Sequence, residues 1–172
     1  MKTTRPAGVI ATTGTLGLFL LATAARADET EIPLDWLPKA VADAARAKFP
    51  GARWREAARE TEDGQTVYEV ALTHEGRRMD VTFRPDGTLE LVETEVPAAD
   101  LPVAVTRAAR DKYPGAKLGV AETVKRGPEL KPEVDYYELH LRTADGTSVE
   151  IEVDGRGKIL KTESGGDEPG EG

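Results

Sequence analysis

The sequence predicts an α+β protein of two tandem repeats, each with one helix packed on a four-stranded antiparallel sheet. Three observations predict this class. A segment of roughly 65 residues occurs twice along the chain. Within each copy, apolar residues first recur at the spacing of a helix and then alternate with polar residues, as they do in half-buried strands. Asp-Gly and Pro-Asp-Gly turns separate the alternating segments, which favours hairpin connections.

The repeat is visible by direct comparison of the two halves. Residues 37–52 align with residues 101–116 at an offset of 64, and 11 of the 16 positions are identical. The strand segments then align at offsets of 69 and 70, so the second copy carries two small insertions where turns are expected. An internal repeat of this length is a stronger signal than any short motif in the chain.

The predicted helices begin after Leu37-Pro38 and Leu101-Pro102. Proline suits the first turn of a helix because its missing N–H would have no partner there. Each helix ends before a Pro-Gly pair, because the residue before proline is disfavoured in the helical region. Apolar residues at helical spacing give each helix one face that can cover a sheet.

Four strands are expected after each helix, the first over residues 54–61 and, in the second copy, 118–125. Alternation in the following segments predicts a buried and a solvated side for each strand. The side chains expected to be buried are Val41, Ala45, Tyr68, Val70, Leu72, Val81 and Phe83 in the first copy, and Val105, Ala109, Tyr137, Leu139, Leu141, Ile151 and Val153 in the second. A unit this small buries little surface, so we expect the two units to pack together.

The N-terminus has the order of a secretory signal peptide. Lys2 and Arg5 precede an apolar stretch that ends in Ala25-Arg26-Ala27, a small-x-small cleavage pattern. The alternative is an uncleaved membrane anchor, but Thr12, Thr13 and Thr15 dilute the stretch. The predicted organisation is therefore a signal peptide over residues 1–27, repeats over 28–95 and 96–163, and a disordered tail over 164–172. We expect a periplasmic or extracellular protein without stable membrane insertion after cleavage.

Composition excludes several kinds of function. The chain of 172 residues has a formal charge of −8, no cysteine and two histidines. Such an acidic chain does not attract nucleic acid or anionic lipid. Disulfides, thiol catalysis and cysteine-ligated metals are excluded.

The order of these motifs resembles the PepSY-like domains, in particular the group described as β-lactamase-inhibitor-like. The resemblance rests on the L-P-x-A-V helix start, the [FY]-P-G-A helix end, the Tyr-Glu-[VL] strand and the terminal D-x-x-G hairpin, in tandem over residues 31–163. It implies an exported α+β protein with a protein-binding or inhibitory role, since related domains occur in metallopeptidase propeptides and the namesake inhibitors bind an enzyme with a sheet surface. It implies no catalytic residue.

Catalytic and metal motifs are sparse. His140 is out of phase with the core residues of its strand, so it is expected to face solvent or a partner. Glu138 or Glu152 would pair with it in a metal site, but three ligands at fixed spacing are not visible in the sequence. Ser148 and Ser164 fall in a hairpin and the tail, which does not suit a nucleophilic triad. We therefore expect no enzyme activity, cofactor or bound metal.

Candidate partner contacts come from position in the predicted sheets. Tyr136 is an aromatic residue out of phase with the core, and packing between the units is its alternative role. Trp36 precedes the first helix, where it would serve as a packing staple or an exposed anchor. The full set of candidates is Tyr136, His140, Glu138, Glu69, Thr82, Arg84 and Trp36.

These features predict a non-catalytic exported module that binds or inhibits another extracytoplasmic protein, an enzyme or peptidase among the candidates, through its sheet surfaces. The alternative is an envelope protein that binds a small ligand or a cation.

Overall fold

The computed structural model of the protein describes residues 29–62 and 64–165. The predicted signal peptide and residues 166–172 of the predicted tail lie outside the described residues. Within the described part of the chain, neither α-helix has the length and apolar character needed to cross a membrane.

A helix followed by four strands occurs twice in the element order, with a short strand before the first set. The helices are η1 (Leu34–Trp36), α1 (Lys39–Lys48), η2 (Ala98–Asp100) and α2 (Val103–Lys112). The strands are β1 (Thr30–Ile32), β2 (Arg53–Glu62), β3 (Gln65–His74), β4 (Arg77–Phe83), β5 (Leu89–Glu95), β6 (Lys117–Arg126), β7 (Tyr136–Arg142), β8 (Ser148–Val153) and β9 (Ile159–Gly165). Strand β9 extends over Ser164 and Gly165, the first two residues of the predicted tail.

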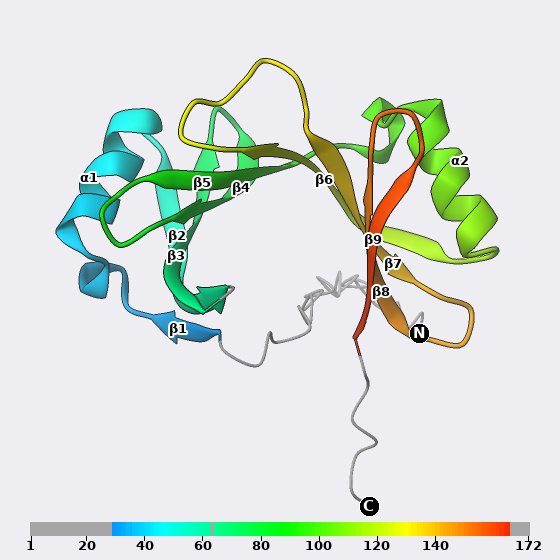
Figure 1. Ribbon diagram of the computed structural model, residues 1–172, viewed down its shortest axis with the longest axis horizontal. Helices are drawn as coiled ribbons and strands as arrows, with labels where there is room; N and C mark the ends of the chain where they lie inside the picture. The colour runs from blue at the N-terminus through cyan, green and yellow to red at the C-terminus, as the bar shows by residue number, and fades with distance from the viewer. Residues whose placement is uncertain (1–28, 63, 166–172) are drawn as a thin grey trace, which may run out of the picture.

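The strands form a single antiparallel sheet in which every strand pairs with its neighbour in sequence, from β1 to β9. The sequence predicted a four-stranded sheet for each helix, but β5 pairs with β6 and joins the two halves edge to edge. Figure 1 shows α1 and α2 at opposite outer sides of the arched sheet. Strand β6 follows α2 in the chain, so within its own half it pairs only with β7, along one edge. Pairing with β5 satisfies the backbone N–H and C=O groups of the other edge.

Each helix covers its own apolar cluster on the sheet. The first cluster contains Val41 and Ala45 of α1, and the second contains Val105 and Ala109 of α2. Of the residues predicted to be buried, twelve are buried: Val41, Ala45, Val70, Leu72, Val81, Phe83, Val105, Ala109, Leu139, Leu141, Ile151 and Val153. The other two, Tyr68 and Tyr137, pack against the clusters but are only partly buried.

Two hairpin glycines let the helices approach the sheet. A Cβ at Gly87 would lie 2.6 Å from the Ala40 carbonyl oxygen, and one at Gly157 would lie 2.6 Å from that of Ala104. Both residues also have positive φ, 85° and 87°, which favours glycine. The last glycine of each turn, Gly87 in Arg84-Pro85-Asp86-Gly87 and Gly157 in Asp154-Gly155-Arg156-Gly157, therefore sets the contact between the last hairpin and the start of its helix.

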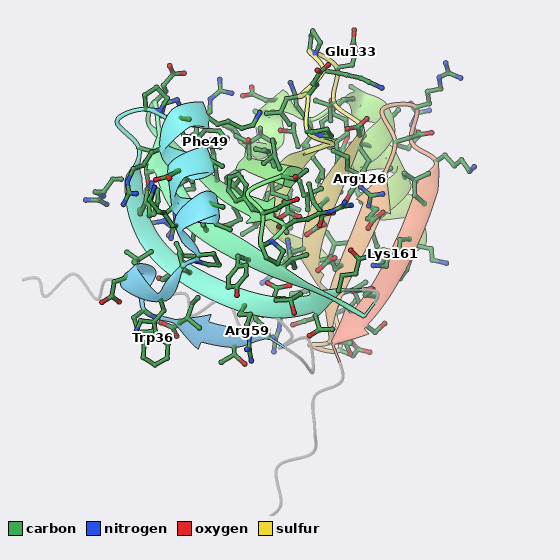
Figure 2. The ribbon with its side chains drawn as sticks, turned by 60° about the vertical axis from the view of Figure 1, so that its left-hand side comes forward. Trp36, Phe49, Arg59, Arg126, Glu133 and Lys161 are labelled. Atoms are coloured by element: carbon green, nitrogen blue, oxygen red, sulfur yellow. The ribbon has the colours of Figure 1, made fainter. Side chains whose placement is uncertain are left out.

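The sheet curves strongly, and its second face lies inside the curve. We call this the concave face. Val67, Val124 and Tyr136 point to it and are buried, although α1 and α2 lie on the other face. A large twisted sheet curls so that its walls shield the middle of its inner face. In Figure 2 the side chains of Arg126 and Lys161 lie within the curve, whereas Trp36 projects outward beside η1.

Candidate functional site

The concave face gathers most of the charged strand residues of the protein. Strand register places Glu69 opposite Thr82, Asp80 opposite Glu93, and Glu122 opposite Glu138. Further along, Glu138 lies opposite Glu152 and His140 opposite Glu150. Because side chains alternate along each strand, these residues share one face across six neighbouring strands, β3 to β8. Acidic groups outnumber basic groups on it.

His140 lies at the centre of the closest polar contacts on this face. Its Nε2 atom is 3.0 Å from Oε1 of Glu138 and 3.5 Å from Oε2 of Glu122. On the other side of the ring, Nδ1 is 3.9 Å from Oε2 of Glu150. The contacts with Glu122 and Glu138 favour the protonated imidazole and raise the pKa of His140 to about 10.

Two carboxyl groups on the neighbouring strands are forced toward their neutral form. Burial, reinforced by the charges of Glu138 and Glu122, raises the pKa of Glu93 to about 9. Burial, with Glu122 as the main repulsive charge, raises the pKa of Asp80 to about 6, although Arg55 opposes this. The Arg55–Asp80 ion pair has a nitrogen–oxygen distance of 3.7 Å. Carboxyl groups crowded in a shielded site thus cannot all ionise.

Tyr136 is held by Arg126 on the same face. The guanidinium of Arg126 donates a hydrogen bond of 3.1 Å to the Tyr136 hydroxyl and lies 4.9 Å from the centre of the Tyr136 ring. Burial raises the pKa of Tyr136 to about 12. The adjoining loop, longer than its counterpart in the first half, is fixed by Lys125, which donates to the carbonyl groups of Lys131 and Pro132.

The structure brings together five of the seven residues predicted as partner contacts. Glu69, Thr82, Tyr136, Glu138 and His140 all lie on the concave face. Arg84 instead pairs with Glu90 at the β4–β5 turn. Trp36 lies in η1, outside the curve, with 71% of its surface exposed.

The expected exposure of this face was wrong for three of these residues. Thr82, Tyr136 and Glu138 are buried, at 4%, 6% and 8% exposure. A polar face is solvated when a sheet is small and open, but here nine strands curl around it. Tyr136 is more buried than Tyr137, which was assigned to the core. The ring of Tyr136 is buried and contacts Arg126, which belongs to the same unit.

Asp80, Glu93 and Glu122 belong to this site and were missed. Alternation placed Asp80 on the polar side of its strand. Register shifts at Thr82–Phe83 and at Leu118–Val120 break the alternation that would have assigned Glu93 and Glu122 to the same face. The β5–β6 pairing that brings the two halves of the cluster together carries no local sequence signal. The predicted metal pairings of His140 were Glu138 or Glu152. The first is close to the ring, whereas Glu152 lies 3.9 Å from Lys161 Nζ.

Comparison with known protein families assigns the chain. The family described as "Putative beta-lactamase-inhibitor-like, PepSY-like" matches residues 66–161, more than half of the sequence. The chain belongs to the PepSY-like family. The related family of peptidase propeptide and YPEB domains, PepSY, matches residues 38–83. Among functionally curated proteins, none matches the sequence of this PepSY-like chain.

Solved structures agree on the fold. A crystal structure described as a putative periplasmic protein from Bacteroides eggerthii has a TM-score of 0.58 and 18% identity, covering 75% of this chain and 89% of its own. A DUF2874 family protein from Bacteroides uniformis has a TM-score of 0.58 and 18% identity, and the match covers 75% of this chain and 90% of the other. A BLIP-like protein from Bacteroides fragilis has a TM-score of 0.52 and 18% identity, and the match covers 73% of this chain and 84% of the other. At this identity the likeness concerns the fold, so partner and site must be argued from the residues of this chain.

Proposed function

We propose that this PepSY-like protein is an exported, non-catalytic module that binds a basic segment of another extracytoplasmic protein along its concave face. The observation that carries the proposal is the crowding of carboxylates on this shielded face, where burial first and the neighbouring carboxylates second raise the pKa of both Glu93 and Asp80. A positively charged segment would relieve that repulsion.

The shape of the face determines what would fit it. Its centre is buried, so a broad flat surface would reach only its margins. His140, Glu150 and Lys161 retain side-chain exposures of 31%, 25% and 45%. A loop or an extended segment carrying Lys or Arg would lie between the walls of the curve and place its positive charge beside the carboxylate of Glu150. Binding that depends on such charges weakens as salt is added.

The wider organisation supports the same role. We propose that the two helix-and-four-strand units are tandem copies of one PepSY-like unit, joined by β5 and β6 into a continuous binding face. The signal-peptide pattern of residues 1–27 and similarity to a protein described as a putative periplasmic protein support the exported location that we propose. The inhibitor-like description of the family favours an enzyme as the source of the bound segment, so that binding would block that enzyme.

Site-specific photo-crosslinking tests the proposed face. A photoreactive amino acid replaces Glu150, on the concave face, or Val103, a 69% exposed residue of α2 that serves as the matched control. Both proteins are expressed in the native host, irradiated in intact cells and recovered. We expect a crosslinked protein species from position 150 and none from position 103. Crosslinks from 103 alone would assign binding to the helical face and contradict the proposal.

A further inference from the structure

Three side chains of the concave face converge on one point. Glu122 lies on β6, and Glu138 and His140 lie two residues apart on β7, with Glu122 directly opposite Glu138. One ligand atom from each of the three lies within 4.8 Å of the others. The arrangement joins an imidazole nitrogen to two carboxylate oxygens, so it is a mixed ligand set rather than a group of carboxylates alone.

The distances match those between ligands that share a metal ion. Two ligands bound about 2.1 Å from a tetrahedral zinc ion lie about 3.4 Å apart. Here Nε2 of His140 lies 3.0 Å and 3.5 Å from the two carboxylate oxygens. A single N–H on Nε2 is directed at one acceptor, so it cannot make two well-aligned hydrogen bonds. A cation at the shared point would contact all three ligand atoms.

The charge of the surroundings also favours a doubly charged ion. Glu122 and Glu138 are 9% and 8% exposed and directly opposed, an arrangement that repels unless it is compensated. His140 supplies at most one positive charge. Beside them, the buried side chain of Glu93 is exposed to the negative charges of Glu138 and Glu122.

We propose that Glu122, Glu138 and His140 bind a first-row divalent metal ion of the zinc type. One nitrogen and two carboxylate oxygens suit zinc, with water in the remaining position. Calcium, which takes six to eight oxygen ligands, does not suit this set. Glu150, near Nδ1 of His140, occupies the place of the outer carboxylate that orients a metal-binding histidine. The partly exposed ring of His140 gives the ion a path from solvent.

Metal titration of the purified protein, made without a histidine tag and freed of metal by a chelator, tests the site. Zinc binding is followed by isothermal titration calorimetry for the wild type and for Glu138→Gln, His140→Ala and His74→Ala. His74, the other of the two histidines in the sequence, lies against Phe49 and is the matched control. We expect one zinc ion per chain, at least about tenfold weaker binding in Glu138→Gln and His140→Ala, and no change in His74→Ala. Calcium should not displace zinc.

A second measurement uses the wild-type protein and so does not depend on the variants folding. Zinc should shift the ring proton signals of one histidine in the nuclear magnetic resonance spectrum, and the His74→Ala spectrum identifies which one. The proposal is overturned by absence of saturable zinc binding or by equal affinity in His140→Ala. It is also overturned if zinc leaves the His140 signals unchanged, or if calcium competes as an equal.

Discussion

Glu93 allows a direct test of the charge crowding on the concave face. The residue lies on β5 opposite Asp80, and burial and the neighbouring charges of Glu138 and Glu122 raise its pKa from 4.5 to about 9. Glu93→Gln keeps the shape of the side chain and removes its titration. The amide occupies the site as the neutral carboxyl does, without having to hold a proton.

The raised pKa of Glu93 determines the sign and size of the change in the free energy of unfolding. Between pH 4.5 and about 9 the native state retains a proton that the unfolded state has released. The contribution of Glu93 to the free energy of unfolding therefore falls as pH rises, by about 1.4 kcal/mol per pH unit across this window. The variant avoids this loss. We expect Glu93→Gln to be more stable than the wild type, with a gain that grows by about 3 kcal/mol from pH 5.5 to pH 8.

Urea unfolding, monitored by the fluorescence of the two tryptophans, measures this difference. A chelator in every buffer keeps metal ions off the protein, and pH 5.5 stays above the isoelectric point of about 4.9. Glu95→Gln is the matched control, because Glu95 shares the strand and face but is 41% exposed and paired with Arg78. Its effect should stay within about 0.5 kcal/mol. A destabilised Glu93→Gln, or a gain that does not change with pH, would refute the reasoning.

Three further predictions concern stability and are measured by denaturant unfolding. Val81→Asp should cost about 3–5 kcal/mol because it buries an unpaired charge in the first core cluster. Thr82→Asp should cost about 2 kcal/mol because Thr82 is buried opposite Glu69, and an unchanged free energy of unfolding in Thr82→Asp would contradict its burial. Gly87→Ala and Gly157→Ala should each cost about 2–3 kcal/mol, because the added Cβ would meet a helix carbonyl oxygen. Gly76→Ala, with positive φ but open space around it, should cost about 1 kcal/mol, and equal costs at all three positions would show that the close approach to the helices does not matter. Tyr136→Phe should cost about 1 kcal/mol through the lost Arg126 hydrogen bond, and Tyr136→Ala about 3 kcal/mol through the lost packing. An unchanged free energy of unfolding in Tyr136→Ala would show that the ring is not buried.

Local pattern predicted the elements and the helix-covered core well. Strands expected over 54–61 and 118–125 are observed as Arg53–Glu62 and Lys117–Arg126. Pro38 and Pro102 precede helices as expected. These features depend on spacing within a few residues, which the sequence displays directly.

The joining of the sheet and the burial of its second face could not be predicted in the same way. Pairing of β5 with β6 brings residues about 30 positions apart into register, as Thr94 with Thr123, and nothing in either segment specifies that partner. Curvature then buries Glu138 and Tyr136, which alternation alone assigned to solvent. Period-2 patterns tell which residues share a face, but not whether that face is open.

The most direct test of the central claim is the affinity of the partner identified by crosslinking for a concave-face variant. Isothermal titration calorimetry would compare the wild type with Glu150→Gln/Glu152→Gln, two substitutions that keep side-chain shape on β8, at low and high salt. The account predicts binding at least about tenfold weaker in the variant, reduced salt dependence and a nearly unchanged melting temperature. Equal affinity in the variant, with binding lost on substitution of Val103 in α2, would contradict it.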